Sequence, residues 1–469
     1  MVSSAVYDYV ASHFAGELKL KDAICPYFGG KDSFVNKAKV ARLADAFGSV
    51  MRDVKQPLVY FGDSGQAFVF NGRFFEEVGS AIPFFSEVFR RAMVMLKVRS
   101  VYCCYAPKDV ARACVESVSA MSEFAYRPDR RYLIFANGVF DTKDGKLKDF
   151  SRRYVSDIVI DMDYNQRASS LLWDRKLKEI IPDKDFRDAF QLFCGSLLIN
   201  RNDVRIEYVC YLVGPGSNGK SVLAGAIAGV FGERYFSRFT PRQLFKDSDA
   251  RVNIAALRGK IANLVGDLNE KDISGGDFKR FVSGEMFQGR RNYGDPIQVP
   301  APPLLCCTNA LPESADDSHG YHRRQLPVYT TRRQWTEEDK DPFLTKKLTE
   351  TESRQAIFNW IYAGFKKVMN NGGNIELGKE VHEAMDAMRD DSNPQRRWWR
   401  DSRWEIATEE TGTWMPLKEV YADYVRYCEE SGEEKVGSRD ISALLKNLGV
   451  AQRRSRGGMQ FLLKEKDEE

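Results

Sequence analysis

The sequence predicts an α/β protein built around a nucleotide-binding domain with a parallel sheet. Short apolar runs alternate with helical patterns, as expected when parallel strands are joined by crossover helices. The apolar runs lie at residues 208–213, 260–265, 303–307 and 325–329. The first run leads directly into a glycine-rich turn with the pattern G-x-x-x-x-G-K-S and then into a helix rich in small residues. We expect this domain to span residues 201–345.

The glycine-rich turn has the composition of a phosphate-binding loop. Gly214, Gly216 and Gly219 leave room for backbone N–H groups to surround phosphate oxygens, and the helix that follows directs its positive end toward them. Lys220 is expected to reach the β- and γ-phosphates, and Ser221 to ligate Mg²⁺. The other loop residues expected to contact the nucleotide are Pro215, Ser217, Asn218 and Val222. The turn therefore predicts ATP and Mg²⁺ as cofactors, and its strand–turn–helix context disfavours an ordinary glycine turn.

Polar side chains also follow two later apolar runs. Asp267 comes at the tip of the second run and is the candidate carboxylate for the metal. Glu270 either polarises the attacking water or is a solvated acidic residue of a loop, and the sequence favours neither alternative. Asn309 follows the third run, where it would hold the lytic water or sense the γ-phosphate. Arg323 and Arg324 precede the fourth run and form either an arginine finger, for which Arg324 is the first choice, or a structural salt bridge. A finger normally acts on the nucleotide of a neighbouring subunit, which predicts a ring.

Four further domains are expected around this one. Residues 1–95 combine helical periodicity with two short strands before Asn71-Gly72, which predicts a small α+β domain. Residues 96–200 are mostly helical, with a strand patch near 132–140, and residues 346–393 read as a helical cap and linker. Residues 394–469 show helix, helix and a basic hairpin that carries Arg453, Arg454 and Arg456. This is the order of a winged helix, and these arginines are candidate DNA contacts.

Two neighbouring tryptophans, Trp398 and Trp399, begin this last region among arginines. They would either stack on DNA or dock the domain against a neighbour, and the sequence favours neither.

Composition limits the classes of function. The 469 residues contain 70 Lys and Arg against 66 Asp and Glu, a net charge of +4, so any contact with nucleic acid must come from local patches. The nine cysteines form no C-x-x-C pair, which favours buried, reduced thiols. No apolar stretch approaches the roughly 18 residues needed to span a membrane. We therefore expect a soluble cytoplasmic protein without a membrane partner.

Two other replication activities are disfavoured. A nicking nuclease needs a pair of histidines flanking one apolar residue, and the four histidines, His13, His319, His322 and His382, contain no such pair. Asp161-Met162-Asp163 resembles a two-aspartate primase centre, but it ends an apolar run and no histidine follows before His319. Neither nicking nor priming is therefore expected.

Residues 205–335 resemble the superfamily 3 helicases of the AAA+ class, specifically the primase–helicase family of satellite phages, plasmids and poxviruses. The resemblance is carried by segments in the family's order: the Walker A loop at 214–221, Walker B at 259–270, B-prime at 279–293, sensor 1 at 302–309 and the arginine-finger segment at 320–328. It implies an AAA+ P-loop ATPase core preceded by a helical domain. The chain has Gly266-Asp267 where many members have Ser-Glu, and residues 1–95 show no resemblance.

In this family the end of the B-prime segment is a hairpin that grips single-stranded DNA. The matching residues here are Arg290, Arg291 and Tyr293. Two charges for phosphates and a ring for stacking suit single-strand binding, and the alternative is an exposed turn with incidental charge.

The resemblance implies an ATP-dependent homo-hexameric DNA helicase that translocates on single-stranded DNA and opens forked duplex DNA. It would replicate a phage, plasmid or integrated mobile element in a bacterial cytoplasm, with a separate primase or other replication proteins as possible partners. A second hypothesis is a DNA-dependent ATPase that loads or remodels replication proteins without processive unwinding. A third is an ATP-switched origin-binding protein, which the full set of candidate hydrolytic residues disfavours. Strand displacement on a forked substrate separates the first two.

Overall fold

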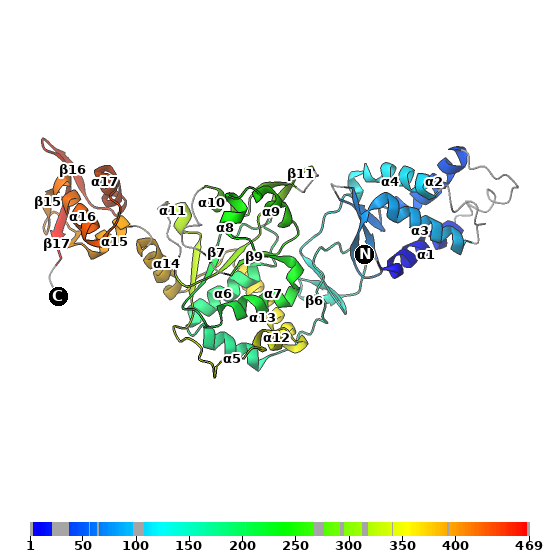
Figure 1. The fold of residues 1–469 in the computed structure, drawn as a ribbon, viewed down its shortest axis with the longest axis horizontal. Coiled ribbons are helices and arrows are strands. Elements are labelled where there is room, and N and C mark those ends of the chain that lie inside the picture. The colour runs from blue at the N-terminus through cyan, green and yellow to red at the C-terminus, as the bar shows by residue number, and fades with distance from the viewer. Residues whose placement is uncertain are drawn as a thin grey trace.

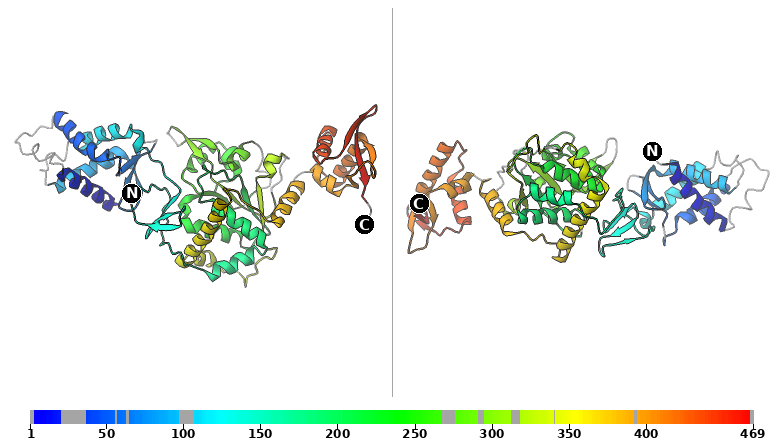
Figure 2. Two further views of the ribbon diagram at one scale, coloured as in Figure 1. Left: turned by 180° about the vertical axis from the view of Figure 1, so that it is seen from behind. Right: turned by 90° about the horizontal axis from the view of Figure 1, so that it is seen from below.

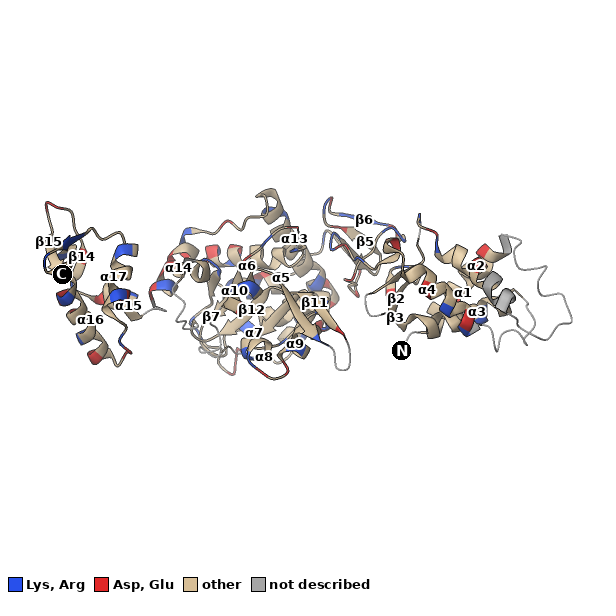
Figure 3. Ribbon diagram, turned by 90° about the horizontal axis from the view of Figure 1, so that it is seen from above, with Lys and Arg blue, Asp and Glu red and all other residues tan. Residues whose placement is uncertain are grey.

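The computed structural model describes residues 3–20, 37–55, 57–62, 65–96, 107–201, 203–266, 268, 276–290, 295–311, 318–339, 341–391 and 394–466. An N-terminal part, a central α/β part and a C-terminal part follow one another along the longest axis (Figure 1). Views from behind and from below show the same succession (Figure 2). Lys and Arg are interspersed with Asp and Glu over all three parts (Figure 3).

The N-terminal part packs four helices against a small antiparallel sheet. Its elements are α1 (Ser4–Leu20), α2 (Lys37–Met51), β1 (Val59–Phe61), β2 (Gln66–Phe70), β3 (Phe75–Ser80), α3 (Ala81–Met95), α4 (Pro107–Ser119) and the 3₁₀ turn η3 (Ser122–Phe124). The expected turn joins β2 to β3, where the Asn71 side chain accepts hydrogen bonds from the N–H groups of Arg73 and Phe74 at 3.0 Å. Buried side chains from Val6 to Phe124 form one core. The boundary expected at residue 95 therefore falls inside this core.

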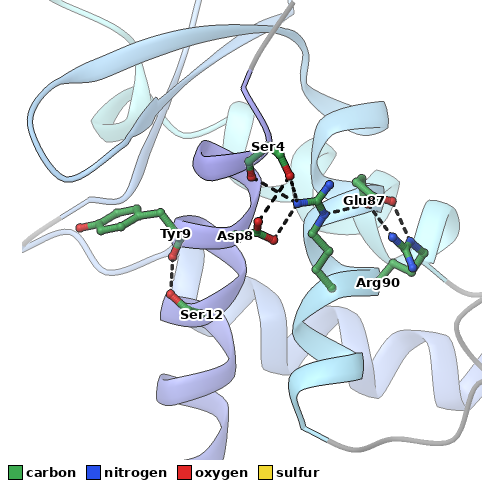
Figure 4. Close-up of polar contacts among 7 residues, drawn as sticks. Ser4, Asp8, Tyr9, Ser12, Glu87 and Arg90 are labelled. Carbon is green, nitrogen blue, oxygen red and sulfur yellow. Dashed lines mark hydrogen bonds and ion pairs between the residues drawn. The ribbon is translucent and has the colours of Figure 1, made fainter.

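Charged side chains join α1 to α3 (Figure 4). Arg91 of α3 donates a hydrogen bond to Asp8 of α1 at 2.7 Å and another to Glu87 at 2.8 Å. Arg90 also donates to Glu87, at 2.7 Å. Hydrogen bonds from Arg90 and Arg91 lower the pKa of Glu87 to about 2 against the effect of burial. Glu87 therefore stays ionised over the usual pH range and holds Arg91 on α3, while the bond from Arg91 to Asp8 links the two helices.

A three-stranded antiparallel sheet lies between the N-terminal and central parts. It consists of β4 (Tyr132–Phe135), β5 (Gly138–Asp141) and β6 (Lys146–Lys148). The Tyr126 N–H donates to the Phe61 carbonyl on the N-terminal side at 2.8 Å. The Val159 N–H donates to the Tyr235 hydroxyl on the central side at 2.6 Å. The segment between residues 125 and 160 is thus attached to both parts.

The central part contains a five-stranded parallel sheet in the order β13-β7-β12-β9-β8. Its strands are β7 (Val209–Val213), β8 (Phe236–Ser237), β9 (Ala262–Val265), β12 (Leu304–Thr308) and β13 (Gln325–Tyr329). Around them lie α5 (Leu171–Ile180), α6 (Lys184–Ser196), α7 (Lys220–Phe231), η4 (Glu233–Tyr235), α8 (Pro241–Phe245), α9 (Ala250–Ala256), α10 (Gly276–Val282), α11 (His319–His322), α12 (Leu344–Leu348) and α13 (Thr351–Asn370). The α/β fold class and the parallel sheet expected from the apolar runs are confirmed.

Both faces of this sheet are covered, as parallel sheets require. Cys210 and Leu212 of β7 belong to a core shared with α5, α6, α7 and α13. Val209 and Tyr211 of the same strand belong to a second core that includes α9 and α10. Because α5 and α6 are part of the first core, hydrophobic packing does not divide at residue 200, where the sequence predicts a boundary.

The C-terminal part has the expected order of helix, helix and hairpin. Helix α14 (Lys379–Asp391) leads to it, followed by α15 (Pro394–Asp401), β14 (Trp404–Ile406), β15 (Thr413–Pro416), α16 (Leu417–Ser431), α17 (Ser438–Asn447), β16 (Gln452–Ser455) and β17 (Gly458–Glu465). Strand β17 pairs with β14, β15 and β16. Trp398 is buried in this core and its indole N–H donates to Asp423 at 3.1 Å. This contact assigns Trp398 to packing within the C-terminal part.

Six cysteines of the described residues are free and buried: Cys114, Cys194, Cys210, Cys306, Cys307 and Cys428. Among the helices in the described ranges, none has the length and apolar composition needed to cross a membrane.

Asp141 of β5 forms ion pairs with Arg131 and Lys148 next to the β4–β6 sheet. We expect Asp141→Asn to destabilise that sheet. Its side chain is fully buried and accepts two hydrogen bonds from Arg131 at 2.7 Å, as well as one from Lys148. Burial opposes ionisation, but the hydrogen bonds from Arg131 and Lys148 lower the pKa of Asp141 well below its usual value. Removing one partner of a fully buried ion pair lowers the free energy of unfolding by about 3–5 kcal/mol. Arg131 and Lys148 are both partly exposed, so we expect a smaller loss of about 2 kcal/mol for Asp141→Asn.

Thermal denaturation and hydrogen exchange of the β4–β6 amides measure this loss. Because the folded-state pKa of Asp141 is lowered, its stabilisation is present above the unfolded pKa and should fade as pH falls below about 4. Asp144→Asn is the control, since Asp144 contacts the same Lys148 from an exposed position. Equal losses in the two variants would contradict the assignment.

Candidate phosphate-binding site

The candidate site lies at the carboxyl ends of the parallel strands. Strand β7 ends at Val213 and continues into the 214–219 loop, while β12 and β13 end beside it at Thr308 and Tyr329. The Gly214 N–H donates to the Thr308 carbonyl at 3.2 Å. This edge is where open α/β sheets bind their ligands, because loops and helix N-termini converge there.

The loop backbone is tightly turned at two positions. Gly219 has φ of +93° and precedes the first turn of α7, and Ser217 has φ of +56°. Within the described ranges, Ser217 is the one non-glycine residue with positive φ. Such a conformation is uncommon outside glycine and turns successive N–H groups toward one concave side. Gly216, Ser217 and Ser221 are exposed, so a phosphate has access to the loop and to the start of α7.

Lys220 is directed into the loop. Its ammonium group donates to the Gly214 carbonyl at 2.5 Å, to the Pro215 carbonyl at 2.7 Å and to the Asn218 side-chain oxygen at 3.2 Å. It also reaches the side-chain oxygen of Asn309 at 3.4 Å. The structure therefore brings together the lysine of the loop and the asparagine after β12, two residues separated by 89 positions in the chain.

The loop is fastened to the segment that follows β13. The Asn218 amide group donates to the Thr330 hydroxyl at 2.7 Å and to the Thr331 carbonyl at 3.0 Å. The Trp335 N–H donates to the Ser217 carbonyl at 2.6 Å. None of the three residues after β13 was predicted from the sequence. Thr330 and Thr331 follow a buried strand as a polar pair, which is the same signal that identified Asn309 after β12.

Two candidate catalytic carboxylates, Asp267 for the metal and Glu270 for the attacking water, were expected after β9. Strand β9 ends at Val265, next to β12 in the sheet, and Gly266 is exposed at the same edge. Asp267 and Glu270 lie outside the described residues. Ser221, the other expected metal ligand, is exposed on the first turn of α7.

Arg323 and Arg324 differ in their surroundings. Arg324 is 12% exposed and is held by Glu207 at 3.3 Å and by the Ser283 hydroxyl at 2.9 Å. Arg323 is 44% exposed and pairs with the same Glu207. Burial tends to raise the pKa of Glu207, but the hydrogen bonds from Ser283 and Arg323 and the charge of Arg324 lower it. The structural salt bridge, one of the two alternatives that the sequence left open, is present for both arginines. Arg323 is the more exposed of the two.

A two-stranded hairpin projects from the central part beyond α10. It consists of β10 (Met286–Arg290) and β11 (Pro296–Pro300), and Arg290 is exposed where β10 ends. Near its turn it packs closely against α9, because a Cβ on Gly289 would come within 2.6 Å of the Ala255 nitrogen. Arg291 and Tyr293, the other expected DNA contacts here, lie outside the described residues.

The C-terminal hairpin exposes its three arginines. Arg453, Arg454 and Arg456 are all exposed on β16 and the turn after it. Arg453 lies over the Trp414 ring at 4.3 Å and donates to Gln460 at 2.9 Å, so its position is set by the sheet. The structure thus brings these three together, at a distance from the phosphate-binding loop (Figure 1).

A cleft of about 990 Å³ lies between the N-terminal and central parts. Its lining includes Lys260 and Pro303, which precede β9 and β12, so it opens at the amino ends of the strands. This is the edge opposite the phosphate-binding loop, and the cleft is therefore separate from the candidate site.

Two protein families match parts of the chain. One, described as "D5 N terminal like", matches residues 42–182. The other is a family of unknown function, DUF5906, which matches residues 212–324 and so includes the phosphate-binding loop, Asn309 and both arginines. Each match covers less than half of the chain. The first begins within the N-terminal part, to which the resemblance seen in the sequence does not extend.

Two apo structures of the NrS-1 C terminal region are similar to this chain. Each has 10% sequence identity and a TM-score of 0.47, and each comparison covers 87% of this chain and 96% of the other. A likeness at this level establishes neither a shared fold nor a shared function.

Proposed function

We propose that this protein is an ATP-driven DNA helicase that acts as a homo-hexamer in the replication of a phage, plasmid or integrated mobile element. The observation that carries the proposal is the contact of Lys220 with the 214–219 loop and Asn309 at the carboxyl edge of a parallel sheet. A loop of this shape with an inward lysine binds phosphates, and an amide group beside the γ-phosphate position suits hydrolysis. The D5 N terminal like match, which covers the chain before this loop, supports the family resemblance.

The described residues fit a nucleotide with a magnesium ion. Exposed N–H groups of the loop and the start of α7 would hold the phosphates, and Lys220 would exchange the carbonyls of Gly214 and Pro215 for phosphate oxygens. The Ser221 hydroxyl would hold the metal. Mg²⁺ bound there would neutralise charge that develops on the β- and γ-phosphates. Asp267 stays our choice for the second metal ligand and Glu270 a candidate for polarising the water.

Arg323 is our choice for a finger that acts on a neighbouring subunit, with Arg324 as its anchor. Its exposure of 44% leaves its guanidinium accessible from outside the subunit, whereas Arg324 is bound on three sides by Glu207, Ser283 and the Gly320 carbonyl. A buried, fully bonded guanidinium would lose these contacts if it moved to a nucleotide. This arrangement supports a ring in which each site is completed by the next subunit.

Two basic hairpins support DNA as the partner. Arg290 is exposed on the hairpin of the central part, and Arg453, Arg454 and Arg456 are exposed on that of the C-terminal part. We assign single-stranded DNA to the first, together with Arg291 and Tyr293, and duplex DNA at the fork to the second. Strand displacement on a forked substrate tests helicase action. ATPase stimulated by DNA without displacement would instead support a loading or remodelling factor.

Lys220→Ala should abolish ATP hydrolysis, because it removes the charge that contacts the β- and γ-phosphates. We expect turnover below a tenth of wild type, a loss of at least about 1.4 kcal/mol of transition-state stabilisation. Steady-state phosphate release measures it, and Lys346→Ala, at an exposed lysine on α12, is the matched control. Retained hydrolysis in Lys220→Ala would refute the assignment of this loop.

Arg323→Ala should also lose hydrolysis, by about 10³-fold or more if it acts as other arginine fingers do. Its loss should be complemented between subunits. Mixing Arg323→Ala with Lys220→Ala subunits creates interfaces that pair an intact Lys220 with an intact Arg323, so activity should return from two inactive proteins. Phosphate release from rings shown to be mixed measures the recovery.

Arg324→Ala tests the distinction between the two arginines. Because Arg324 is anchored within its own subunit, we expect a lower melting temperature and no such complementation. Recovery with Arg324→Ala but not with Arg323→Ala would reverse the assignment.

Arg454→Ala combined with Arg456→Ala should weaken binding of duplex DNA and reduce its salt dependence. Loss of each phosphate contact should make the log–log salt slope shallower by about 0.9. Fluorescence anisotropy at several salt concentrations measures the slope. Lys435→Ala is the control, since Lys435 lies in the same part but pairs with Glu429 at 2.6 Å. An unchanged slope in the double variant would remove this hairpin from the DNA-binding surface.

A further inference from the structure

We propose that Thr330 is a positioning residue of the phosphate-binding loop, which acts through Asn218 to orient Lys220 for the nucleotide. The inference rests on the proposed ATP-hydrolysing function and extends it to a residue outside the loop. Thr330 follows β13 directly and lies 112 positions from Asn218 in the chain. It is joined to the loop by a chain of buried hydrogen bonds.

The direction of each bond in this chain is determined by the chemistry of its groups. The Thr330 hydroxyl donates its single proton to the Val213 carbonyl at 2.9 Å. It can therefore only accept from Asn218, and the amide nitrogen must face it, at 2.7 Å. The second amide proton goes to the Thr331 carbonyl at 3.0 Å. The amide oxygen of Asn218 is consequently turned toward the ammonium of Lys220, at 3.2 Å.

Because these groups are buried, the orientation of the Asn218 amide decides whether their hydrogen bonds are satisfied. Asn218 is 1% exposed, Thr330 6% and Lys220 7%, so water has little access to replace a missing partner. With the amide group reversed, its N–H groups would face the ammonium, so two donors would oppose each other and the amide N–H groups would lose their acceptors. The Thr331 carbonyl, which can only accept, and the Thr330 hydroxyl, which gives its proton to the Val213 carbonyl, together disfavour this alternative.

Close packing holds the loop against the same hydroxyl. A Cβ on Gly214 would come within 2.2 Å of the Thr330 oxygen and 2.8 Å of the Asn218 nitrogen. The first glycine of the loop is thus required for the approach of Thr330, in addition to any role toward phosphate. The Thr330 side chain at the end of β13 therefore contacts the start of the loop and its buried asparagine directly, and it acts on the lysine through that asparagine.

Thr330→Val tests the proposal, because valine keeps the shape and removes the hydroxyl. In this variant Asn218 and Lys220 would have to be ordered when the nucleotide binds. The free-energy cost of that ordering would be the same for the bound substrate and for the transition state. The KM for ATP and the Kd for a fluorescent ATP analogue should rise by roughly tenfold, as expected for one buried hydrogen bond, while kcat changes by less than about threefold. Thr330→Ser, which keeps the hydroxyl, should restore wild-type values.

Two controls accompany these variants in the full chain. Thr349→Val removes a hydroxyl that bonds only within α12, near the far end of α7, and should leave KM unchanged. Lys220→Ala tests the proposed function itself. If Lys220→Ala abolishes hydrolysis while Thr330→Val keeps the wild-type KM and Kd, the positioning role is wrong and the function stands. If Lys220→Ala hydrolyses ATP as wild type does, the proposed function fails. Equal losses in Thr330→Val and Thr330→Ser would overturn the role of the hydroxyl.

Asn218→Asp examines the same contacts from the other end, should Thr330→Val not fold. Its carboxylate cannot donate to Thr330 or to the Thr331 carbonyl, and it would retain Lys220 in an ion pair. We expect weaker binding of the ATP analogue by at least tenfold. Binding as tight as wild type would overturn the proposal.

Discussion

The parallel pairing of β7 with β13 is the constraint on which the candidate site depends. Their register places Val209 beside Gln325 and Val213 beside Tyr329. Because parallel strands run together, residues that precede them meet at one edge and residues that follow them meet at the other. Glu207 therefore meets Arg323 and Arg324 before the strands, and the 214–219 loop meets Thr330 after them. A shift of register would disturb both contacts at once.

The same strand pair gives a physical link between the 214–219 loop and the two arginines that precede β13. One end of β13 carries the proposed finger for a neighbouring subunit, and the other end holds the loop of its own subunit. Arg324 at one end and Thr330 at the other are both held by hydrogen bonds, so the strand connects two ordered sets of contacts. Arg324 belongs to this scaffold through Glu207 and Ser283, and Arg323 is the more exposed of the two arginines.

The strands and the loop could be predicted because their signals are local. Apolar runs of strand length gave the five-residue strands β7, β12 and β13 nearly to the residue, and the G-x-x-x-x-G-K-S turn specified its own backbone conformation. Boundaries between parts could not be predicted in this way. Helix α4 packs with α2 and α3, and α6 packs with α13, but their sequences indicate only that each has an apolar face. Which faces meet depends on contacts between residues far apart in the chain.

By itself, the sequence determined the α/β fold class, the position of the candidate phosphate-binding loop and the residue types available there, because each is encoded within a few consecutive residues. Only the tertiary structure decided how these residues combine. It brought Asn309 to Lys220, gave Arg323 and Arg324 different exposures, and joined Thr330 to the loop by a hydrogen bond. The physical reason is that a hydrogen bond between strand ends requires a sheet order and a register, and these follow from the packing of the whole central part.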